Sequence, residues 1–249
     1  MNLNKIYIIT IDHSQENYDS IISRLAKLNI QTAVPYEIYP GVNGKESFST
    51  KKSRDEYGVK FYDGWKLTDS SNSWWTRKVS VGEAGCVCSH IKVWEDAYKN
   101  GYENILILED DFDPTSESPW EYFNELDNYD WDIAYLSRIL QSVVSDDIVD
   151  YDIEKNNWVS PGYSYQTHSY VINKSGLKKL IETNLPILKN NIIPADEFLP
   201  STYTTHPRKD LQELFIKNMN AVATKRNLII QLRNSAYGNS QTEPIEGLD

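Results

Sequence analysis

The sequence predicts a single α/β domain with a mainly parallel central sheet flanked by helices. The chain opens with a strand, a helix and a second strand, an order that favours parallel pairing. The apolar run Ile105–Leu108 has the composition of a central strand that is buried on both faces. The 249 residues, with 40% hydrophobic side chains, can bury a large core without disulfide support.

The first elements follow from hydrophobic spacing and helix-capping residues. Ile6–Ile11 has the length and β-branched composition of a buried strand. Ser14 can cap the helix that follows it, because apolar residues then recur at helical spacing, at Tyr18, Ile21, Ile22, Leu25 and Leu28. Val34–Tyr39 is predicted to be a second strand. Residues 45–80 are polar with scattered aromatics, so we expect a partly mobile loop there.

The remaining elements are predicted from apolar periodicity. A helix is expected from about Glu83 to Lys99, ended by Asn100-Gly101. Further strands are expected at Ile105–Leu108, Ile133–Leu136, Tyr170–Ile172 and Leu228–Leu232. One helix should carry Leu177, Leu180 and Ile181, and a later one Leu211, Leu214, Phe215 and Met219. We expect an irregular connection at 137–158 and a polar tail after Asn234.

Composition excludes several classes of protein. The formal charge of −11 repels nucleic acid and anionic lipid, so no nucleic-acid partner is expected. No run of about 18 apolar residues and no basic, apolar leader is present, so we expect a cytoplasmic, soluble intracellular protein without a membrane span. The two cysteines, Cys86 and Cys88, are expected to be reduced thiols in a helix, because a disulfide at that spacing would be strained.

Three acids follow the predicted central strand directly: Glu109, Asp110 and Asp111. Ligands of open α/β sheets bind at the carboxyl ends of strands, and adjacent carboxylates repel one another unless a cation neutralises them. A hard divalent ion that bridges carboxylate and diphosphate oxygens would do so. The alternative is a solvated acidic turn. Asp113 extends the cluster to an Asp-x-Asp pair that can also hold the metal.

A second acidic pair, Asp196 and Glu197, lies between prolines far from the first cluster. It can supply a general base for an acceptor hydroxyl, or it can be a pair of acids that favours the N-terminus of a helix. Of the 4 histidines, none has the context of a zinc motif. His90 can be a packed residue or a ligand. Hydrolase, kinase and Rossmann motifs are absent from the sequence.

The order and spacing of several segments resemble glycosyltransferase family twenty-five, which includes lipopolysaccharide glycosyltransferases and procollagen galactosyltransferases. The core of the resemblance is Gly82-Glu83-Ala84-Gly85-Cys86, Ser89-His90, Trp94 and Ile107-Leu108-Glu109-Asp110-Asp111. Other segments are similar to the collagen-modifying branch, namely residues 130–135, 163–165, 170–172 and 194–200, His206-Pro207 and Ser240-Gln241-Thr242-Glu243. The likeness runs from Lys5 to Glu243.

The resemblance implies a GT-A-type nucleotide-diphospho-sugar transferase fold, a Mn²⁺ requirement and a UDP-sugar donor. Carried over by position, Glu109, Asp110 and Asp111 would bind the metal and the diphosphate, together with Ser89 of the signature. Thr10, Ile11 and Asp12 would lie near the uracil and ribose. Metal ligands would come from Asp111, Asp113 and Asp196, with His206 left open. Where the family has an arginine after the first strand, this chain has Asn17, and Arg24 is the nearest candidate replacement.

The resulting hypothesis is a metal-dependent, inverting hexosyltransferase that uses UDP-galactose or UDP-glucose. Asp196 and Glu197 would be its catalytic carboxylates, and its acceptor the hydroxylysine or galactosyl-hydroxylysine of collagen-like chains. A lipopolysaccharide or other glycan acceptor is the alternative within this class. A non-catalytic sugar- or partner-binding relative is the alternative from another class. We expect residues 1–113 to form the nucleotide-sugar-binding half of the single domain 1–249, and residues 114–249 its acceptor-side half.

Overall fold

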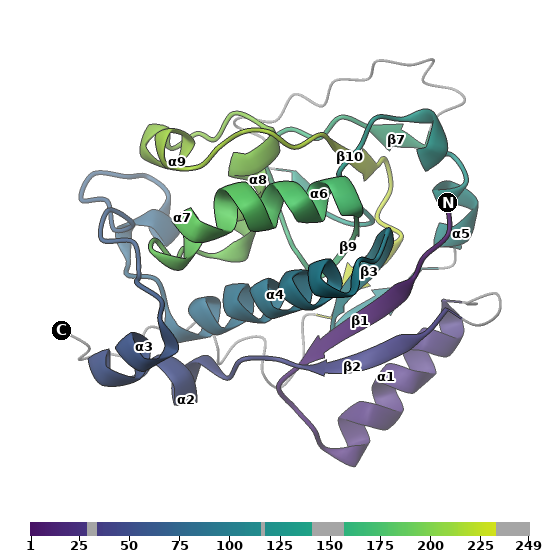
Figure 1. Cartoon of the computed structure of the whole chain (residues 1–249), viewed down its shortest axis with the longest axis horizontal. Helices are drawn as coiled ribbons and strands as arrows, with labels where there is room; N and C mark the ends of the chain where they lie inside the picture. The colour runs from purple at the N-terminus through teal and green to yellow at the C-terminus, as the bar shows by residue number, and fades with distance from the viewer. Residues whose placement is uncertain (29–33, 116–117, 141–156, 233–249) are drawn as a thin grey trace.

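The computed structural model describes residues 1–28, 34–115, 118–140 and 157–232, which form one seven-stranded sheet with helices on both faces (Figure 1). The strand order is β2-β1-β3-β9-β5-β10-β7. Pairing is parallel for β1 with β2 and β3 and for β5 with β10, whereas β9 and β7 are antiparallel to their neighbours. The predicted α/β class with a mainly parallel sheet is confirmed. The strands are β1 (Lys5–Thr10), β2 (Tyr36–Pro40), β3 (Asn104–Glu109), β5 (Ile133–Tyr135), β7 (Trp158–Val159), β9 (Ser169–Asn173) and β10 (Ala221–Thr224).

The sheet divides the core into two layers because successive side chains of a strand point to opposite faces. On β3, Ile105 and Ile107 pack in one cluster and Leu106 and Leu108 in the other. All of them are buried, as predicted for a central strand. The first layer is covered by α4 (Val81–Asn100), α6 (Lys174–Lys179), α7 (Leu185–Lys189) and α8 (Ala195–Tyr203), and the second by α1 (Gln15–Lys27) and α5 (Pro119–Phe123).

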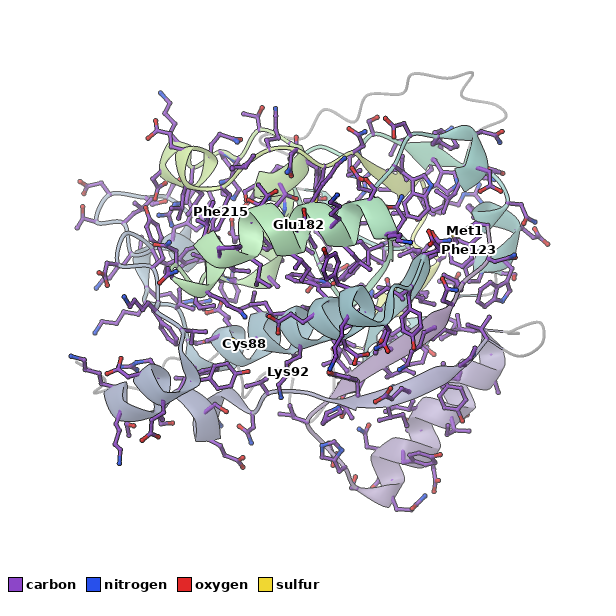
Figure 2. The ribbon with its side chains drawn as sticks, in the orientation of Figure 1. Met1, Cys88, Lys92, Phe123, Glu182 and Phe215 are labelled. Atoms are coloured by element: carbon purple, nitrogen blue, oxygen red, sulfur yellow. The ribbon has the colours of Figure 1, made fainter. Side chains whose placement is uncertain are left out.

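The predicted helix near Glu83–Lys99 is α4, which crosses the centre of Figure 1 beside α6. Ser80 caps its N-terminus and forms a capping box with Glu83. Gly101 ends it in the left-handed conformation, with φ at 69°. Both cysteines are free thiols on this helix, as predicted. Cys88, labelled on α4 in Figure 2, is the buried one, and burial raises its pKa to about 12.

Residues 45–80 are more ordered than expected. The segment contains helices α2 (Gly44–Phe48) and α3 (Lys51–Tyr57) and a 3₁₀ turn, η1 (Ser73–Thr76). Each begins at a polar residue whose side chain accepts a backbone N–H, namely Asn43, Thr50 and Asn72. The prediction of a loop without helices was therefore wrong, because three local caps and buried anchors such as Phe48 and Trp65 outweigh the segment's polar composition.

The second half completes the sheet and adds two small ribbons. β11 (Ile229–Gln231), the predicted strand at 228–232, pairs with β4 (Phe112–Pro114), and β6 (Ile139–Leu140) pairs with β8 (Ser164–Tyr165). The helix expected from Leu211 to Met219 is shorter: α9 is Lys209–Leu214, and Met219 is buried beyond its end. A π-helical turn, η3 (Leu180–Asn184), joins α6 to α7, and a 3₁₀ turn, η2 (Leu126–Asn128), follows α5.

Two expectations lie wholly or largely outside the described residues: the polar tail after Asn234, which includes Ser240–Glu243, and most of the connection 137–158. Within the described part of the chain, no helix combines the length and hydropathy that crossing a bilayer requires.

Candidate active site

The carboxyl ends of β1 and β3 lie side by side because the two strands are parallel and in register, with Ile9 opposite Glu109. The Asp110 amide donates to the carbonyl of Ile9 over 3.0 Å. Its carboxylate accepts a short hydrogen bond from the Thr10 hydroxyl. The predicted residues Thr10 and Asp110, a hundred positions apart, are thus in direct contact at one edge of the sheet.

Asn17 and Arg24 both support this contact from α1. The Asn17 amide donates to Thr10 Oγ1 at 3.0 Å and to the carbonyl of Asp12 at 2.9 Å. Arg24 donates to the carbonyl of Asp110 at 2.6 Å, and its guanidinium lies 5.2 Å from the Phe112 ring centre. Asn17 therefore orders the end of β1, and Arg24 reaches the acid cluster through a backbone oxygen.

Glu109 is held by a side chain of α4 and by one from the loop between β8 and β9. His90 on α4 lies 3.1 Å from Glu109 Oε1, and the Thr167 hydroxyl donates to the same oxygen at 2.8 Å. The other ring nitrogen of His90 lies 2.9 Å from the hydroxyl of Tyr170. Because a carboxylate only accepts, Nε2 must carry the proton toward Glu109. Burial acts to raise the pKa of Glu109, but the hydrogen bonds and charge of its neighbours, His90 first, hold it below its usual value.

His90 is thus a packed residue that orients Glu109. It is also one of three side chains, with Cys86 and Glu109, whose donor atoms all lie within 4.8 Å of one another and can hold a metal ion. Burial raises the pKa of the Cys86 thiol well above its usual value, and nearby acids, Glu109 first, add to this. A thiol, an imidazole and one carboxylate form a donor set for a soft ion such as zinc rather than for a hard ion.

Asp111 has the environment of a cation ligand. Its Oδ2 accepts from the Gln231 amide at 2.8 Å, whereas its Oδ1 is buried without a hydrogen-bond partner. Burial and the charges of Glu109 and Asp110 raise the pKa of Asp111 to about 7. A buried, unpartnered carboxylate oxygen beside further acids is unfavourable unless the group is protonated or a cation is bound. The residues present therefore fit a hard divalent ion.

A cavity of about 390 Å³ brings the two predicted acidic sites together. Glu109, Asp110 and Asp111 contribute to its lining, and so do Asp196 and Glu197 from the first turn of α8. Burial and the charges of Glu197, Glu83 and Glu109 raise the pKa of Asp196 to about 8. The structure thus joins, in one acidic cavity, five carboxylates that the sequence placed in two distant clusters.

Glu197 differs from Asp196 in that both of its oxygens already accept hydrogen bonds. Trp75 donates to Oε1 at 2.9 Å, Tyr163 donates to Oε2 at 2.6 Å, and His206 Nε2 lies 2.9 Å from Oε2. The other His206 nitrogen accepts from the Arg208 amide at 3.0 Å, so Nε2 carries the proton and donates. With 3% of its surface exposed, Glu197 acts as the centre of a buried network.

Other predicted site residues do not reach the cavity. Asp113 pairs with Lys27 at 3.1 Å on β4. Ser89 is buried, donates to the carbonyl of Gly85 and accepts from the amide of Val42. Asp12 accepts from the amide of Ser14 just before α1, and Ile11, at the end of β1, is absent from the cavity lining. His206 contacts Glu197 rather than the acids after β3.

Several cavity residues were missed by the sequence interpretation: Trp65, Trp74, Tyr165, Gln166, Thr167 and Gln231. They lie on loops, short strands or the 3₁₀ turn η1, and of them only Tyr165 belongs to a segment that carries the family resemblance. One backbone feature marks the place, because Gln166 has φ at 91°, the only positive φ of a non-glycine residue in the described part of the chain. Such strain is concentrated at functional sites, but it is visible only in the structure.

The sequence profile of glycosyltransferase family 25, described as an LPS biosynthesis protein, matches residues 3–199. The chain belongs to glycosyltransferase family 25. The predicted family is therefore confirmed. The match covers Thr10, the acids after β3, and both Asp196 and Glu197.

Relatives in animals share this family assignment at moderate identity. A glycosyltransferase 25 family member of Aedes aegypti is 31% identical over 90% of this chain, and procollagen galactosyltransferase 2 of Homo sapiens is 27% identical over 86%. A Bos taurus relative, described as a probable inactive glycosyltransferase 25 family member 3, is 25% identical over 86%. The chain spans about a third of the length of these relatives, at 34%, 33% and 34%.

Similarity to solved structures is weak. Mannose-1-phosphate geranyltransferase from Thermus thermophilus aligns with a TM-score of 0.40 at 11% identity, over 90% of this chain and 74% of that one. Mouse xyloside xylosyltransferase 1 aligns with a TM-score of 0.36 at 10% identity, over 91% of this chain and 98% of that one.

Proposed function

We propose that this chain is a metal-dependent glycosyltransferase that moves galactose or glucose from a UDP-sugar to the hydroxyl of hydroxylysine, or of galactosyl-hydroxylysine, in collagen-like chains. The observation that carries the proposal is the buried, unpartnered Oδ1 of Asp111 in a cavity shared with Asp196. Family membership and the relatives described as procollagen galactosyltransferases support the class and the acceptor.

The proposed donor half of the site is the edge formed by β1 and β3. Thr10, Asn17 and Arg24 fix Asp110, and His90 and Thr167 fix Glu109. Asp111, with Asp110 beside it, would hold Mn²⁺, a hard ion that takes carboxylate oxygens. When bound, such an ion would neutralise charge on the diphosphate oxygens and favour departure of UDP.

The proposed transfer is a single displacement with inversion at the anomeric carbon. The acceptor hydroxyl oxygen forms the new bond to that carbon while the bond from the carbon to the diphosphate oxygen breaks, and UDP leaves with the bonding electrons. Asp196 takes the hydroxyl proton. Its raised pKa makes it a stronger base than an exposed aspartate. Among the described residues no side chain donates a hydrogen bond to it, whereas Glu197 is occupied.

The proposal is tested by release of UDP from UDP-galactose and, separately, from UDP-glucose in the presence of Mn²⁺. Each donor is combined with a hydroxylysine peptide, its galactosylated form, an oligosaccharide or no acceptor. Turnover with one donor that is stimulated by one peptide supports the full proposal. Turnover stimulated only by oligosaccharides supports a lipopolysaccharide or other glycan acceptor instead, in keeping with the LPS description of the family.

A non-catalytic relative is the second candidate, favoured by the similarity to a bovine protein described as probably inactive. The same assay separates the two candidates. A folded protein that binds UDP without turnover in any combination supports the non-catalytic candidate. Asp111→Asn is the matched variant, because it should abolish both turnover and metal-dependent UDP binding in an active enzyme.

A further inference from the structure

Two consecutive tryptophans in η1 face different environments. Trp75 donates to buried Glu197 at 2.9 Å. Trp74 lines the cavity and remains 47% exposed. The mechanism described above does not use it. Because about half of the Trp74 side chain is exposed while it lines the cavity, the indole is accessible to a ligand that enters there.

Trp74 is held in place by a chain of charged contacts. The Arg77 guanidinium lies 4.4 Å from the Trp74 ring centre. Arg77 in turn makes two hydrogen bonds to Glu83, at 2.7 and 2.5 Å, and Glu83 is fixed in the capping box of α4. From the backbone side, the Trp74 amide donates to Asn72 at 3.0 Å. The ring is therefore braced before any ligand arrives, which lowers the entropic cost of binding.

The cavity near Trp74 combines apolar surface with hydrogen-bond acceptors. Ile139, which is 45% exposed, and Tyr165 line it as well. Glu83 and Asp196 add carboxylates, and the described residues that line it include no lysine or arginine. This combination is complementary to a neutral hexose, whose C–H face packs on an aromatic ring while its hydroxyls donate to carboxylates. Away from a bound cation, an anionic ligand would be repelled by these carboxylates.

Trp74 belongs to the same wall as Asp196. Its neighbour Trp75 is tied to Glu197, the residue next to Asp196, and Asn72 reaches the hydroxyl of Tyr165 at 3.4 Å. Thr10 and Asp110, which would lie near the donor, contact β1, α1 and β3 instead. These contacts tie the turn that carries Trp74 to the side of the cavity formed by Tyr165 and the first turn of α8, and none of them reaches Thr10 or Asp110.

We propose that Trp74 is a stacking platform for a hexose that is already present on the acceptor, so that the glycosylated acceptor is preferred to the bare hydroxyl. The inference rests on the proposed function, because it takes Asp196 as the residue that faces the acceptor. Of the acceptors named in the proposed function, it favours galactosyl-hydroxylysine or another hexose-bearing acceptor over the bare hydroxylysine. Stacking on an aromatic ring contributes about threefold to tenfold in affinity.

The test compares Trp74→Ala and Trp74→Phe with Tyr18→Ala, which removes an aromatic of similar exposure, 46%, from α1. Kinetic constants are measured for the UDP-sugar, for the bare hydroxylysine peptide and for the hexosylated peptide. Direct binding of the hexosylated peptide is measured by calorimetry. Trp74→Ala should raise KM and Kd for the hexosylated peptide about threefold to tenfold, while kcat and the KM for donor stay unchanged. Trp74→Phe should keep most of the affinity, and Tyr18→Ala all of it.

Either of two results with the variants would overturn the inference. One is an equal change in the KM for donor, which would mean that the ring stacks on the nucleotide. The other is an unchanged affinity for the hexosylated peptide in Trp74→Ala. Failure of the proposed function gives a different result. In that case the folded wild-type protein shows no turnover but binds the hexosylated peptide in a Trp74-dependent manner. The stacking role of Trp74 would then be supported and the transferase assignment contradicted. Absence of any such binding by wild type overturns the platform as well.

Discussion

The side-chain amide of Gln231 donates to Oδ2 of Asp111 at 2.8 Å, across 120 positions of sequence. The backbone N–H of Leu232 also donates to the backbone carbonyl of Asp111 at 2.8 Å. The segment that contains β11 therefore fixes both the backbone and one carboxylate oxygen of Asp111 and leaves the other oxygen, Oδ1, buried without a partner. Residues that orient a metal ligand commonly contribute to affinity for the metal.

Gln231→Ala should weaken metal-dependent nucleotide binding because Asp111 loses the group that orients it. We expect about a tenfold rise in the apparent Kd for Mn²⁺ in the presence of UDP, measured by the shift in Tm as Mn²⁺ is titrated. Asp111→Asn should remove the shift altogether, whereas in wild type a ligand at about 100 times its Kd should add about 2.7 kcal/mol to stability. Gln15→Ala, which removes an exposed amide on α1, is the control. An unchanged Mn²⁺ titration in Gln231→Ala would show that Gln231 does not position Asp111.

How much of this site could be predicted from the sequence depended on how far apart in the chain the contacting residues lie. The acids after β3 were predicted because strand composition and adjacent carboxylates are local signals, and the parallel pairing of β1 with β2 followed from the strand–helix–strand order. Gln231 and Thr167 were not predicted, because each reaches an acid across long stretches of chain. No local pattern distinguishes such a glutamine or threonine from a solvated one.

Asp113 and Glu197 show a second limit. The Asp-x-Asp pattern treats Asp111 and Asp113 alike, but Asp111 lies in the turn before β4 and lines the cavity, whereas Asp113 lies on β4 and pairs with Lys27. The two acids of α8 are likewise equivalent in sequence, whereas aromatic and imidazole donors converge on Glu197 alone. The acidic clusters were thus visible in the sequence, and tertiary contacts decided what each acid can do.

Transfer should depend on pH through Asp196. Burial and neighbouring acids raise its pKa from the usual value to about 8, and a general base must be unprotonated to accept the hydroxyl proton. Activity should therefore fall as pH decreases through the pKa of Asp196. A profile of kcat/KM from about pH 5.5 to about pH 9 tests this, and Asp196→Asn should lower activity by about a hundredfold or more. A wild-type profile that is flat across this range would contradict this role.

The same shift predicts the effect of Asp196→Asn on stability. An acid whose pKa is higher in the folded than in the unfolded state reduces stability as pH rises from the unfolded value, about 4, to the folded one, about 8. Asparagine does not ionise, so near the upper end of this range the variant should unfold at an equal or higher Tm than wild type. If Asp196→Asn had a lower Tm than wild type near pH 8 but an equal Tm near about pH 4, ionised Asp196 would be shown to stabilise the fold.

Glu197 should contribute more to stability than Asp196. It accepts three hydrogen bonds in a buried setting. In Glu197→Gln one oxygen becomes an NH₂ group that faces those donors, so we expect a loss of about 2–4 kcal/mol in unfolding free energy. Tyr163→Phe removes a single donor and should cost about 1–2 kcal/mol. Urea denaturation measures both losses. A Glu197→Gln variant as stable as wild type would show that the hydrogen bonds to Glu197 do not stabilise the fold.

Gly85 of the signature has a packing role that can be tested separately from chemistry. α2 lies against α4, and a Cβ on Gly85 would stand 2.6 Å from the carbonyl oxygen of Val42 and 2.8 Å from the amide nitrogen of Gly44. These are backbone atoms, so the helices must separate. Gly85→Ala should cost about 1–3 kcal/mol through overpacking.

Gly58→Ala is the matched control for Gly85→Ala, because a Cβ there meets nothing within 4 Å while φ is 79°. It should cost only about 1–2 kcal/mol through the left-handed conformation. The two variants should also differ in function. Displacement of α2 from Gly85 disturbs the start of α4, where Glu83 holds Arg77 and hence Trp74, so Gly85→Ala should lower acceptor affinity. Gly58→Ala should leave acceptor affinity unchanged. Equal acceptor affinity in the two variants, measured well below their Tm, would mean that the α2–α4 contact stabilises the fold without shaping the cavity.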